Sequence, residues 1–296
     1  MKKRSWISWN VLKNSCLIAI ICLGFPLIAQ SQNVFESGLR MKMDSLINEK
    51  GTAKHQFSAL LPNNSVQSIM TPTGWGGGNS TYAFVVLGGV YPAMYTEPNT
   101  GDLAGAFGIS GGNSSKFINV SASMNVVRVS EFRDLSMNLV VSRQIIGGTS
   151  ISAGALHLFA SPSVSDAPDA SYYLAISHAS QKIKSRSEGY SGLSYTLGYG
   201  TGRFRYKSPM DEFTGKGKYG TGFFANISYE IIRQVNFNLE WSGLNLGVSS
   251  GIRPIKGSAF TFGFGVFNLT KFSGDRIQLF GTVGYPVLLN KRSKVN

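Results

Sequence analysis

The sequence predicts an all-β protein, a single antiparallel up-and-down transmembrane β-barrel of about twelve strands that follows a short helical or irregular N-terminal segment. Strict alternation of apolar and small polar residues from about residue 80 onward, in stretches of about nine to twelve residues, is the first observation. The second is composition: 35 of 296 residues are glycine and only 15% are charged. An average protein has about 7% glycine and about 25% charged residues.

The first element is an N-terminal export signal at residues 1–31. Four cations, three of them at residues 2–4, precede an apolar stretch of 13 residues from Cys16 to Ile28, which is too short to span a membrane as a helix. Ala29 and Ser31 suit the −3 and −1 positions of a signal-peptidase site. Both cysteines lie in the segment that would be removed, so the mature chain is expected to contain no disulfide.

The charge balance indicates what the mature chain avoids and what it attracts. The sequence has 28 Lys and Arg against 15 Asp and Glu, and removal of the four signal cations leaves 24 against 15, a net charge of about +9. The cations are scattered singly through predicted turns, without the stripe or aromatic interleaving of a nucleic-acid-binding motif. Outer-membrane lipid and lipopolysaccharide are therefore the expected partners, and no cofactor or metal is predicted.

The second element, residues 32–79, is expected to be an N-terminal periplasmic or plug segment. Apolar residues between Val34 and Ile47 have rough helical spacing, and Gly51 is a plausible helix end. This spacing predicts one short amphipathic helix at the periplasmic rim, or alternatively a helix that threads the lumen. The stretches 61–64 and 73–79 are loops by composition.

The third element, residues 80–296, is the predicted barrel. Between Lys116 and Arg128 the even positions are apolar while Asn and Ser occupy odd positions, and residues 235–242 repeat the alternation. The polar faces carry Ser, Asn, Thr and Gly, which suit the inside of a closed sheet, whereas a soluble sandwich would carry Lys and Glu on shorter strands. Closure also leaves no unpaired strand edge in hydrocarbon.

Twelve strands are counted, although ten or fourteen stay open because the alternation is poor near Tyr82 and Ile151. They are expected near residues 81–91, 103–111, 116–128, 134–144, 149–160, 170–181, 190–201, 219–232, 235–242, 244–253, 258–269 and 276–287. The charged, glycine-rich connection at 207–218 is typical of an extracellular loop.

Two motifs resemble a known family. Leu197–Arg205 reads LGYGTGRFR and resembles the LGxGxGRFR of an uncharacterised family of exported, predicted outer-membrane β-barrel proteins of cyanobacteria and related Gram-negative bacteria. Residues 240–249 read EWSGLNLGVS and resemble its DWTGxDLNxGVS, with Glu240 where the family has Asp. The resemblance implies export and the outer membrane of a Gram-negative bacterium, and it assigns no substrate. The chain ends without the aromatic residue that finishes many outer-membrane barrels.

The inward charges and amides are the candidate site. Alternation places Glu230 and Glu240 on the lumen face, where each can pair with Arg203 or Arg205, or can line a pore that selects cations. The candidate lumen-lining or pairing residues are Glu240, Glu230, Arg203, Arg205, Asn226, Asn236, Asn238 and Asn245.

Aromatic residues near the predicted strand ends are interpreted as anchors at the membrane interface. They are Trp75, Trp241, Tyr82, Tyr91, Tyr199, Tyr229 and Tyr285.

A catalytic site is weighed and not favoured. His157 and His178 fall on neighbouring predicted strands, close enough to meet, and Asp166 and Asp169 lie in the loop between them. Without motif spacing, histidines satisfied by their neighbours are the simpler interpretation.

Three functions therefore stay open. The leading hypothesis is a non-enzymatic outer-membrane barrel acting as a pore, a small-solute uptake protein or a structural envelope protein. The alternative is a soluble periplasmic or secreted all-β binding protein, which requires the aromatic face at 260–266 to pack against a second sheet. The third is an outer-membrane barrel hydrolase. The sequence predicts neither the solute nor the oligomeric state.

Overall fold

A computed structural model describes residues 59–63, 65–75, 81–97, 99–128, 133–160, 170–253 and 260–289. The predicted export signal, the predicted helix within 34–47, Asp166 and Asp169 lie outside the described residues. The described strands are β1 Leu61–Pro62, β2 Tyr82–Tyr91, β3 Asp102–Gly112, β4 Asn119–Arg128, β5 Arg133–Ile146, β6 Thr149–Leu158, β7 Ser171–Ala179, β8 Tyr190–Ser191, β9 Leu193–Gly200, β10 Phe223–Ile232, β11 Val235–Trp241, β12 Leu246–Ile252, β13 Thr261–Phe267 and β14 Gln278–Leu288.

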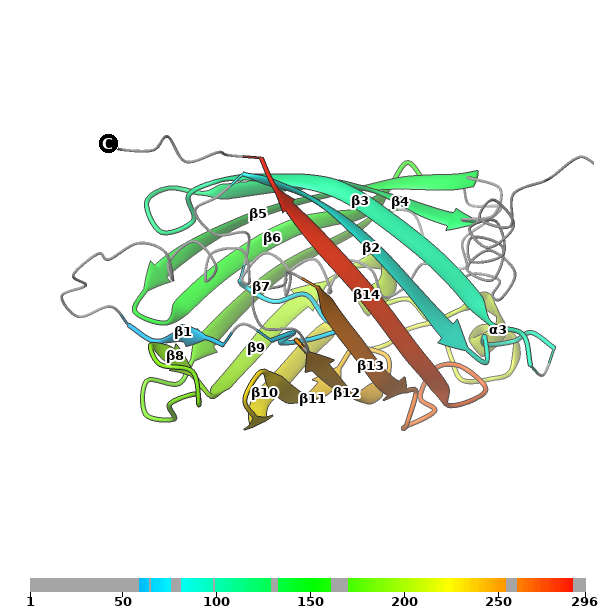
Figure 1. Ribbon diagram of the computed structural model, residues 1–296. Coiled ribbons are helices and arrows are strands. Elements are labelled where there is room, and N and C mark those ends of the chain that lie inside the picture. Colours follow the sequence, from blue (N-terminus) through cyan, green and yellow to red (C-terminus); the bar gives the residue numbers. More distant parts are fainter. Residues whose placement is uncertain are drawn as a thin grey trace, which may run out of the picture.

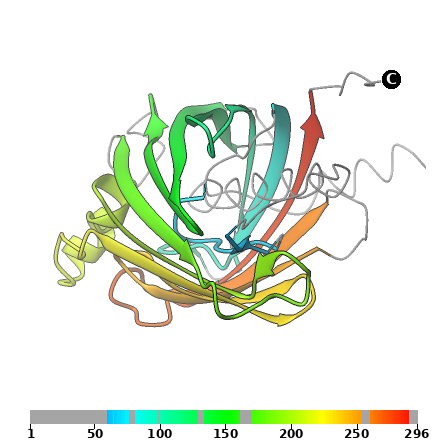
Figure 2. The same ribbon diagram turned by 90° about the vertical axis from the view of Figure 1, so that its left-hand side faces the viewer.

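Twelve of these strands form a closed barrel in the part of the chain that the structure describes (Figure 1). Each strand pairs antiparallel with its neighbour, β14 pairs with β2 to close the ring, and β7 pairs with β9. Viewed end-on, the strands surround an interior (Figure 2). The predicted fold class and strand number are confirmed, and each barrel strand falls at its predicted place.

Two short strands lie outside the barrel order. β1 and β8 pair in parallel, Leu61 with Tyr190 and Pro62 with Ser191, at the connection between β7 and β9. The predicted strand 190–201 therefore contains two elements, β8 and β9, separated by Gly192.

The alternation of the sequence becomes an inside and an outside. On β10, Ile227 and Tyr229 are 51% and 49% exposed, whereas Ser228 between them is 1% exposed. Outward side chains on the other strands are likewise mostly large and apolar. Phe262 and Phe264 are 39% and 53% exposed, so no second sheet covers the face that the soluble sandwich alternative requires. The packed second sheet that this alternative requires is therefore absent among the described residues, because the sheet closes on itself.

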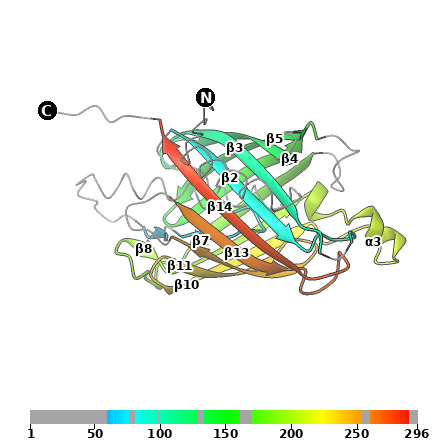
Figure 3. The same cartoon turned by 45° about the vertical axis from the view of Figure 1, so that its right-hand side comes forward.

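The two rims of the barrel differ. At one rim, here called the terminal rim, β2 begins and β14 ends, and short connections such as residues 147–148 and 233–234 join strands. The opposite rim, called the loop rim, carries the connections 92–101 and 201–222, and the latter contains η1 Gly202–Phe204 and α3 Pro209–Phe213. α3 projects past the strands at the loop rim (Figure 3). No helix among the described residues is long and apolar enough to cross a membrane.

The barrel interior contains an apolar cluster that alternation did not predict. Tyr82, Phe84 and Val86 point inward from β2 and pack with Phe267 of β13 and Phe280 of β14. β2 therefore has apolar residues on both faces, which explains its poor alternation in the sequence.

Two predicted interface anchors are consequently wrong. Tyr82 is 0% exposed and Trp75 is 5% exposed, because both lie inside the barrel. Tyr91, Tyr199, Tyr229 and Tyr285 are 40–49% exposed on the outer face.

Candidate functional site

A stretch of chain before β2 lies inside the barrel. Its described residues, 59–63 and 65–75, are here called the lumen segment (blue in Figure 2). Residues 61–62 pair with β8 at the terminal rim, and the following residues continue into the interior. Nine of its side chains, some polar and some apolar, are at most 5% exposed. They are Asn63, Ser65, Val66, Gln67, Ser68, Ile69, Thr71, Thr73 and Trp75.

Glu240 holds the centre of this segment. Its carboxylate, on the inner face of β11, accepts hydrogen bonds from the backbone N–H groups of Ile69 at 3.0 Å, Met70 at 2.7 Å and Thr71 at 3.2 Å. The Ser68 hydroxyl donates to the same carboxylate at 2.5 Å. Glu240 is 0% exposed. Successive backbone N–H groups that converge on one anion form a strong, charge-assisted contact.

The barrel wall completes the coordination of this carboxylate. Ser249, on the neighbouring strand β12, donates to Glu240 Oε1 at 2.6 Å and accepts from the Asn238 side-chain amide at 3.0 Å. The negative charge of Glu240 is thus balanced by donors from the lumen segment and from the wall. A buried carboxylate without such donors would be strongly unfavourable.

Further hydrogen bonds fasten the lumen segment along its length. They connect it to β6, β7, β9, β11 and β12, on both sides of the Glu240 contact. The bonds are Asn63 to Asn236 at 2.8 Å, Ser65 to the Gly251 carbonyl at 2.5 Å, Ser194 to Gln67 at 2.5 Å, Ser152 to the Thr73 carbonyl at 2.8 Å and the Gly74 N–H to Ser177 at 2.7 Å.

Close approach to the wall requires glycine at inward positions. A Cβ at Gly251 would lie 2.3 Å from the Cβ of Val66, and one at Gly247 would lie 2.2 Å from the Phe267 ring. Val66 and Ile69 complete the apolar cluster of β2, β13 and β14. Polar anchors on one side of the lumen segment and apolar packing on the other fix its path.

The first motif, Leu197–Arg205, builds an aromatic contact near the loop rim. A Cβ at Gly198 would lie 2.1 Å from the Phe224 ring, and one at Gly200 would lie 2.4 Å from the Phe204 ring. The two rings lie 4.7 Å apart, and Tyr173 packs against both. The glycines of the motif therefore make room for inward aromatic rings.

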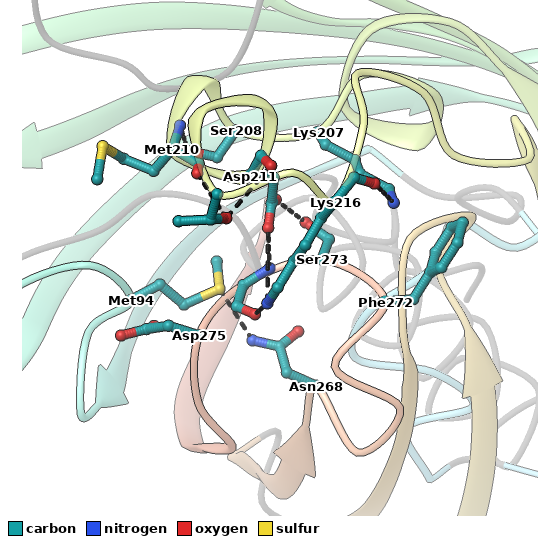
Figure 4. Close-up of polar contacts among 12 residues, drawn as sticks. Met94, Lys207, Ser208, Met210, Asp211, Lys216, Asn268, Phe272, Ser273 and Asp275 are labelled. Atoms are coloured by element: carbon teal, nitrogen blue, oxygen red, sulfur yellow. Dashed lines mark hydrogen bonds and ion pairs between the residues drawn. The ribbon is translucent and has the colours of Figure 1, made fainter.

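Loops at the loop rim meet around Asp211, which is 0% exposed (Figure 4). Its carboxylate accepts from Tyr95 Oη, from the Ser273 hydroxyl at 2.5 Å and from the Gly274 N–H at 2.7 Å, and Lys216 Nζ lies 3.9 Å away. Burial, with the hydrogen bond to and charge of Asp211, raises the pKa of Tyr95 to about 12. The connections β2–β3, β9–β10 and β13–β14 are joined at this one carboxylate.

Two residues extend this contact. Lys207 donates to the Lys216 carbonyl at 2.7 Å and lies 3.5 Å from the Phe272 ring centroid, and burial lowers the pKa of its ammonium group. Asn245 donates to Asn268 at 2.9 Å and accepts from the Phe272 N–H at 3.0 Å. The predicted site residue Asn245 thus ties the β11–β12 connection to the β13–β14 connection.

The predicted pairing of lumen carboxylates with arginines is wrong. Glu240 binds the lumen segment, and Glu230 accepts from the Arg186 N–H at 2.8 Å and the Gln234 N–H at 3.2 Å at the terminal rim. Arg203 and Arg205 follow β9 at the opposite rim, where Arg203 lies over the Phe204 ring and Arg205 over the Tyr219 ring. The partners of both carboxylates include backbone N–H groups, and neither carboxylate pairs with Arg203 or Arg205.

The predicted asparagines fall in three settings. Asn236 and Asn238 bind the lumen segment, the latter through the Val66 carbonyl at 3.3 Å. Asn245 lies at the loop rim. Asn226 is 2% exposed opposite Glu240 in the β10–β11 register, and its side-chain amide has no hydrogen-bond partner among the described residues.

The two histidines do not meet. His178 pairs in register with Thr149 at the terminal-rim end of β6, whereas His157 lies eight residues further along the same strand, a separation of about 27 Å at ~3.4 Å per residue. Antiparallel pairing of β6 with β7 places them at opposite ends, because each lies near the far end of its own strand. The predicted proximity is wrong.

Sequence reasoning missed the Ser68–Thr71 turn and Asp211. The turn has no motif, although its Ser-x-x-Thr spacing permits the local bond between the Ser68 and Thr71 hydroxyls at 2.9 Å. Asp211 lies two residues after Pro209 and three after Ser208, whose side chain caps α3. A Ser-Pro pair followed by an acidic residue is typical of a helix start, so the sequence could have predicted this helix.

Comparisons with known proteins concern the fold. No protein-family model matches the chain, and no curated protein sequence matches it. Among solved structures it is similar to a KdgM porin, with 14% identity, a TM-score of 0.39 and coverage of 71% of this chain and 99% of the porin. It is also similar to a KdgM porin in complex with disordered oligogalacturonate, with 14% identity, a TM-score of 0.38 and coverage of 71% and 99%.

A third similar structure is the high-pH structure of Pseudomonas putida OprB, with 8% identity, a TM-score of 0.30 and coverage of 78% of this chain and 100% of OprB. At these values the likeness carries no argument about function. The class that the geometry itself defines is a closed twelve-stranded antiparallel β-barrel with a segment of its own chain inside. The resemblance to the uncharacterised exported family stays a prediction.

Proposed function

We propose that the protein is a non-enzymatic barrel of the Gram-negative outer membrane that serves as a restricted channel for small polar solutes. Residues 1–31 direct export, residues 32–79 include the plug, and residues 80–296 include the barrel wall. The terminal rim faces the periplasm and the loop rim faces outward, since bacterial barrels have short periplasmic turns and longer outer loops.

The outer face supports the membrane location. Leu174, Leu197 and Phe223 are 54–57% exposed on neighbouring strands, and an outward surface of this kind is unfavourable in water. Every barrel strand has two hydrogen-bonded neighbours, so no strand edge is left for hydrocarbon to desolvate.

The inner face supports passage of polar solutes. The buried inward positions of β4, β5, β10 and β11 are mostly Ser and Asn, which are small and hydrogen-bonding. A pore lined by such residues suits neutral or weakly charged polar solutes, because it offers donors and acceptors with few fixed charges.

The lumen segment is the observation that makes the channel restricted. It occupies the interior and is fastened at Glu240 by hydrogen bonds from four consecutive residues, Ser68 to Thr71. Passage therefore requires the lumen segment to shift, and the Glu240 contact sets how readily it does so.

Conductance in planar lipid bilayers tests this function. We expect wild-type protein to give rare openings of low conductance, and Glu240→Gln to give more frequent and larger openings, because a neutral amide holds the three backbone N–H groups less well. Glu230→Gln is the matched control, since Glu230 is also an inward carboxylate held by backbone N–H groups but binds the terminal rim.

The outcomes separate a channel from a structural protein. Equal currents with and without protein, for wild type and Glu240→Gln alike, would overturn the channel and leave a structural envelope role. Equal opening by Glu230→Gln would overturn the specific role of Glu240. A deletion of residues 65–74, measured in parallel, guards against misfolding of the point variant, because removal of the lumen segment must also raise the current.

A further inference from the structure

We propose that the outer side of the β9–β10 connection binds the phosphate group of an outer-leaflet lipid, lipid A, through Arg205 and Lys218. This inference rests on the proposed function for the orientation of the barrel in the outer membrane. It assigns a ligand to cations that the channel does not use.

The two cations share one aromatic residue. The Arg205 guanidinium carbon lies 5.6 Å from the centroid of the Tyr219 ring, and Lys218 Nζ lies 6.0 Å from it. Both side chains are exposed. Two positive charges within about 6 Å of the centre of one ring form a basic patch, and charge-assisted bonds from Arg and Lys are the usual protein contacts of phosphate.

The backbone around this patch is ordered by cross-strand hydrogen bonds. The Gly220 N–H donates to the Arg205 carbonyl at 2.6 Å and the Lys207 N–H donates to the Lys218 carbonyl at 3.0 Å. The Tyr206 and Tyr219 rings lie 5.5 Å apart across the same pair of segments. The backbone positions from which Arg205 and Lys218 extend are therefore set before any ligand arrives, which lowers the entropic cost of binding.

Carboxylates in this connection do not neutralise the patch. Asp211 is buried and already accepts from Tyr95, Ser273 and Gly274. The ion pairs found among the described residues are Lys216 with Asp211 and Arg276 with Asp275, and neither includes Arg205 or Lys218. An anion from outside the chain is thus the electrostatic complement of these two cations.

A lipid fits better than a free anion because the patch continues into the lipid-facing wall. Arg205 Nη1 donates to Tyr199 Oη at 3.5 Å, and the Tyr199 ring packs 5.0 Å from the Phe223 ring. Tyr199 and Phe223 are 42% and 56% exposed on the outward face of β9 and β10. A ligand with an anionic head and acyl chains satisfies both the cations and the apolar surface beneath them.

Binding of defined lipids to the folded full-length mature barrel in neutral detergent tests the proposal. The probes are lipid A with both phosphates, the same lipid without phosphate, and inorganic phosphate. We expect the double variant Arg205→Gln/Lys218→Gln to bind bisphosphorylated lipid A about thirtyfold more weakly than wild type, which corresponds to ~1 kcal/mol for each of two cations near the membrane surface.

The matched control is Lys116→Gln/Lys182→Gln, which removes two exposed cations at the terminal rim and should bind lipid A as wild type does. Equal binding by the Arg205/Lys218 variant and wild type, or equal binding of phosphate-free lipid, would overturn the proposal. Inorganic phosphate that binds as tightly as lipid A would also overturn it, because the source would then be a free anion. Folding is verified by the change in gel mobility on boiling, so the assay is independent of conductance.

Discussion

Two walls of the barrel interior are built from the same small residues but use them differently. On β4 and β5 the inward amides and hydroxyls bond across the strands, as Asn125 does to Ser136 at 3.1 Å and Asn138 does to Asn125 at 2.9 Å. This surface is here called the polar wall. On β11 and β12, here called the anchor wall, the inward groups bond to the lumen segment through Asn236, Asn238 and Glu240.

Small polar residues on an inner wall can therefore either bond to one another or bond to the lumen segment, and their composition alone does not distinguish the two cases. Asn and Ser satisfy each other across the polar wall, since both donate and accept. The anchor wall adds one acidic residue, Glu240, which cannot donate when ionised and must find donors elsewhere. Because Glu240 only accepts hydrogen bonds, whereas Asn and Ser both donate and accept, the anchor wall binds the backbone N–H groups of the lumen segment.

The largest expected effect comes from Glu240→Gln. We expect the free energy of unfolding to fall by about 3 kcal/mol, because Gln keeps one acceptor oxygen but replaces the other with an NH2 group that faces donors. A buried donor left without an acceptor costs about 1–3 kcal/mol, and the remaining bonds lose the strength that the charge gave them. The measurement is urea unfolding in lipid vesicles. Glu230→Gln, at the terminal rim, provides the comparison.

Release of the lumen segment gives the same variant a second readout. The predicted mature chain contains no cysteine, so Thr73→Cys introduces a single thiol at a position that is 2% exposed. We expect slow maleimide labelling in this background and fast labelling when Glu240→Gln is added. Equal labelling rates would show that Glu240 does not hold the lumen segment.

A smaller effect is expected from Gly251→Ala on the anchor wall. Because its Cβ would lie 2.3 Å from Val66, overpacking should cost about 1–3 kcal/mol. Gly281→Ala is the matched control, since a Cβ at this barrel position meets nothing within 4 Å. Thermal loss of the unboiled gel band measures both, and an equal shift for the two variants would contradict close packing of the lumen segment.

Paired serine variants compare the walls directly. Ser249→Ala removes a bond to the Glu240 carboxylate and should cost about 1.5–3 kcal/mol, whereas Ser136→Ala removes a neutral bond and should cost ~1 kcal/mol. Only the anchor-wall variant should speed labelling of Thr73→Cys. A faster rate with Ser136→Ala would mean that the polar wall also holds the lumen segment.

The barrel could be predicted because period-two alternation persists over whole strands. Residues 116–128 and 235–242 each have one apolar and one small polar face. Closure was predicted because an open sheet would leave unpaired strand edges in hydrocarbon. Strand β2 was harder to predict, because its inward residues Tyr82, Phe84 and Val86 are apolar. They belong to the same apolar cluster as Val66 and Ile69 of the lumen segment. Alternation fails where the inside of the barrel is itself filled with chain.

The candidate site was predicted in part. The period-two alternation of β11 predicted that Glu240 points inward. Its partners could not be predicted, because every non-proline residue has a backbone N–H group and the sequence does not mark which of them will bind. The prediction that Arg203 and Arg205 pair with the lumen carboxylates rested on opposite charge and on their place on a nearby strand. Their place at the loop rim follows from the end of β9 at Gly200, which alternation locates only to within a few residues.

The smallest expected effect concerns the pKa of Tyr95, which joins the β2–β3 connection to Asp211 at the loop rim. Its phenol donates to Asp211, and its pKa rises from about 10 to about 12. A raised pKa in the folded state means that the stabilisation is complete below pH 10 and is lost as pH rises toward 12. A tyrosinate absorbance titration, taken as wild type minus Tyr95→Phe, should therefore show a midpoint near pH 12 while the barrel stays folded. Asp211→Asn should move that midpoint down, and a wild-type midpoint near 10 would show that the three connections are not joined through this contact.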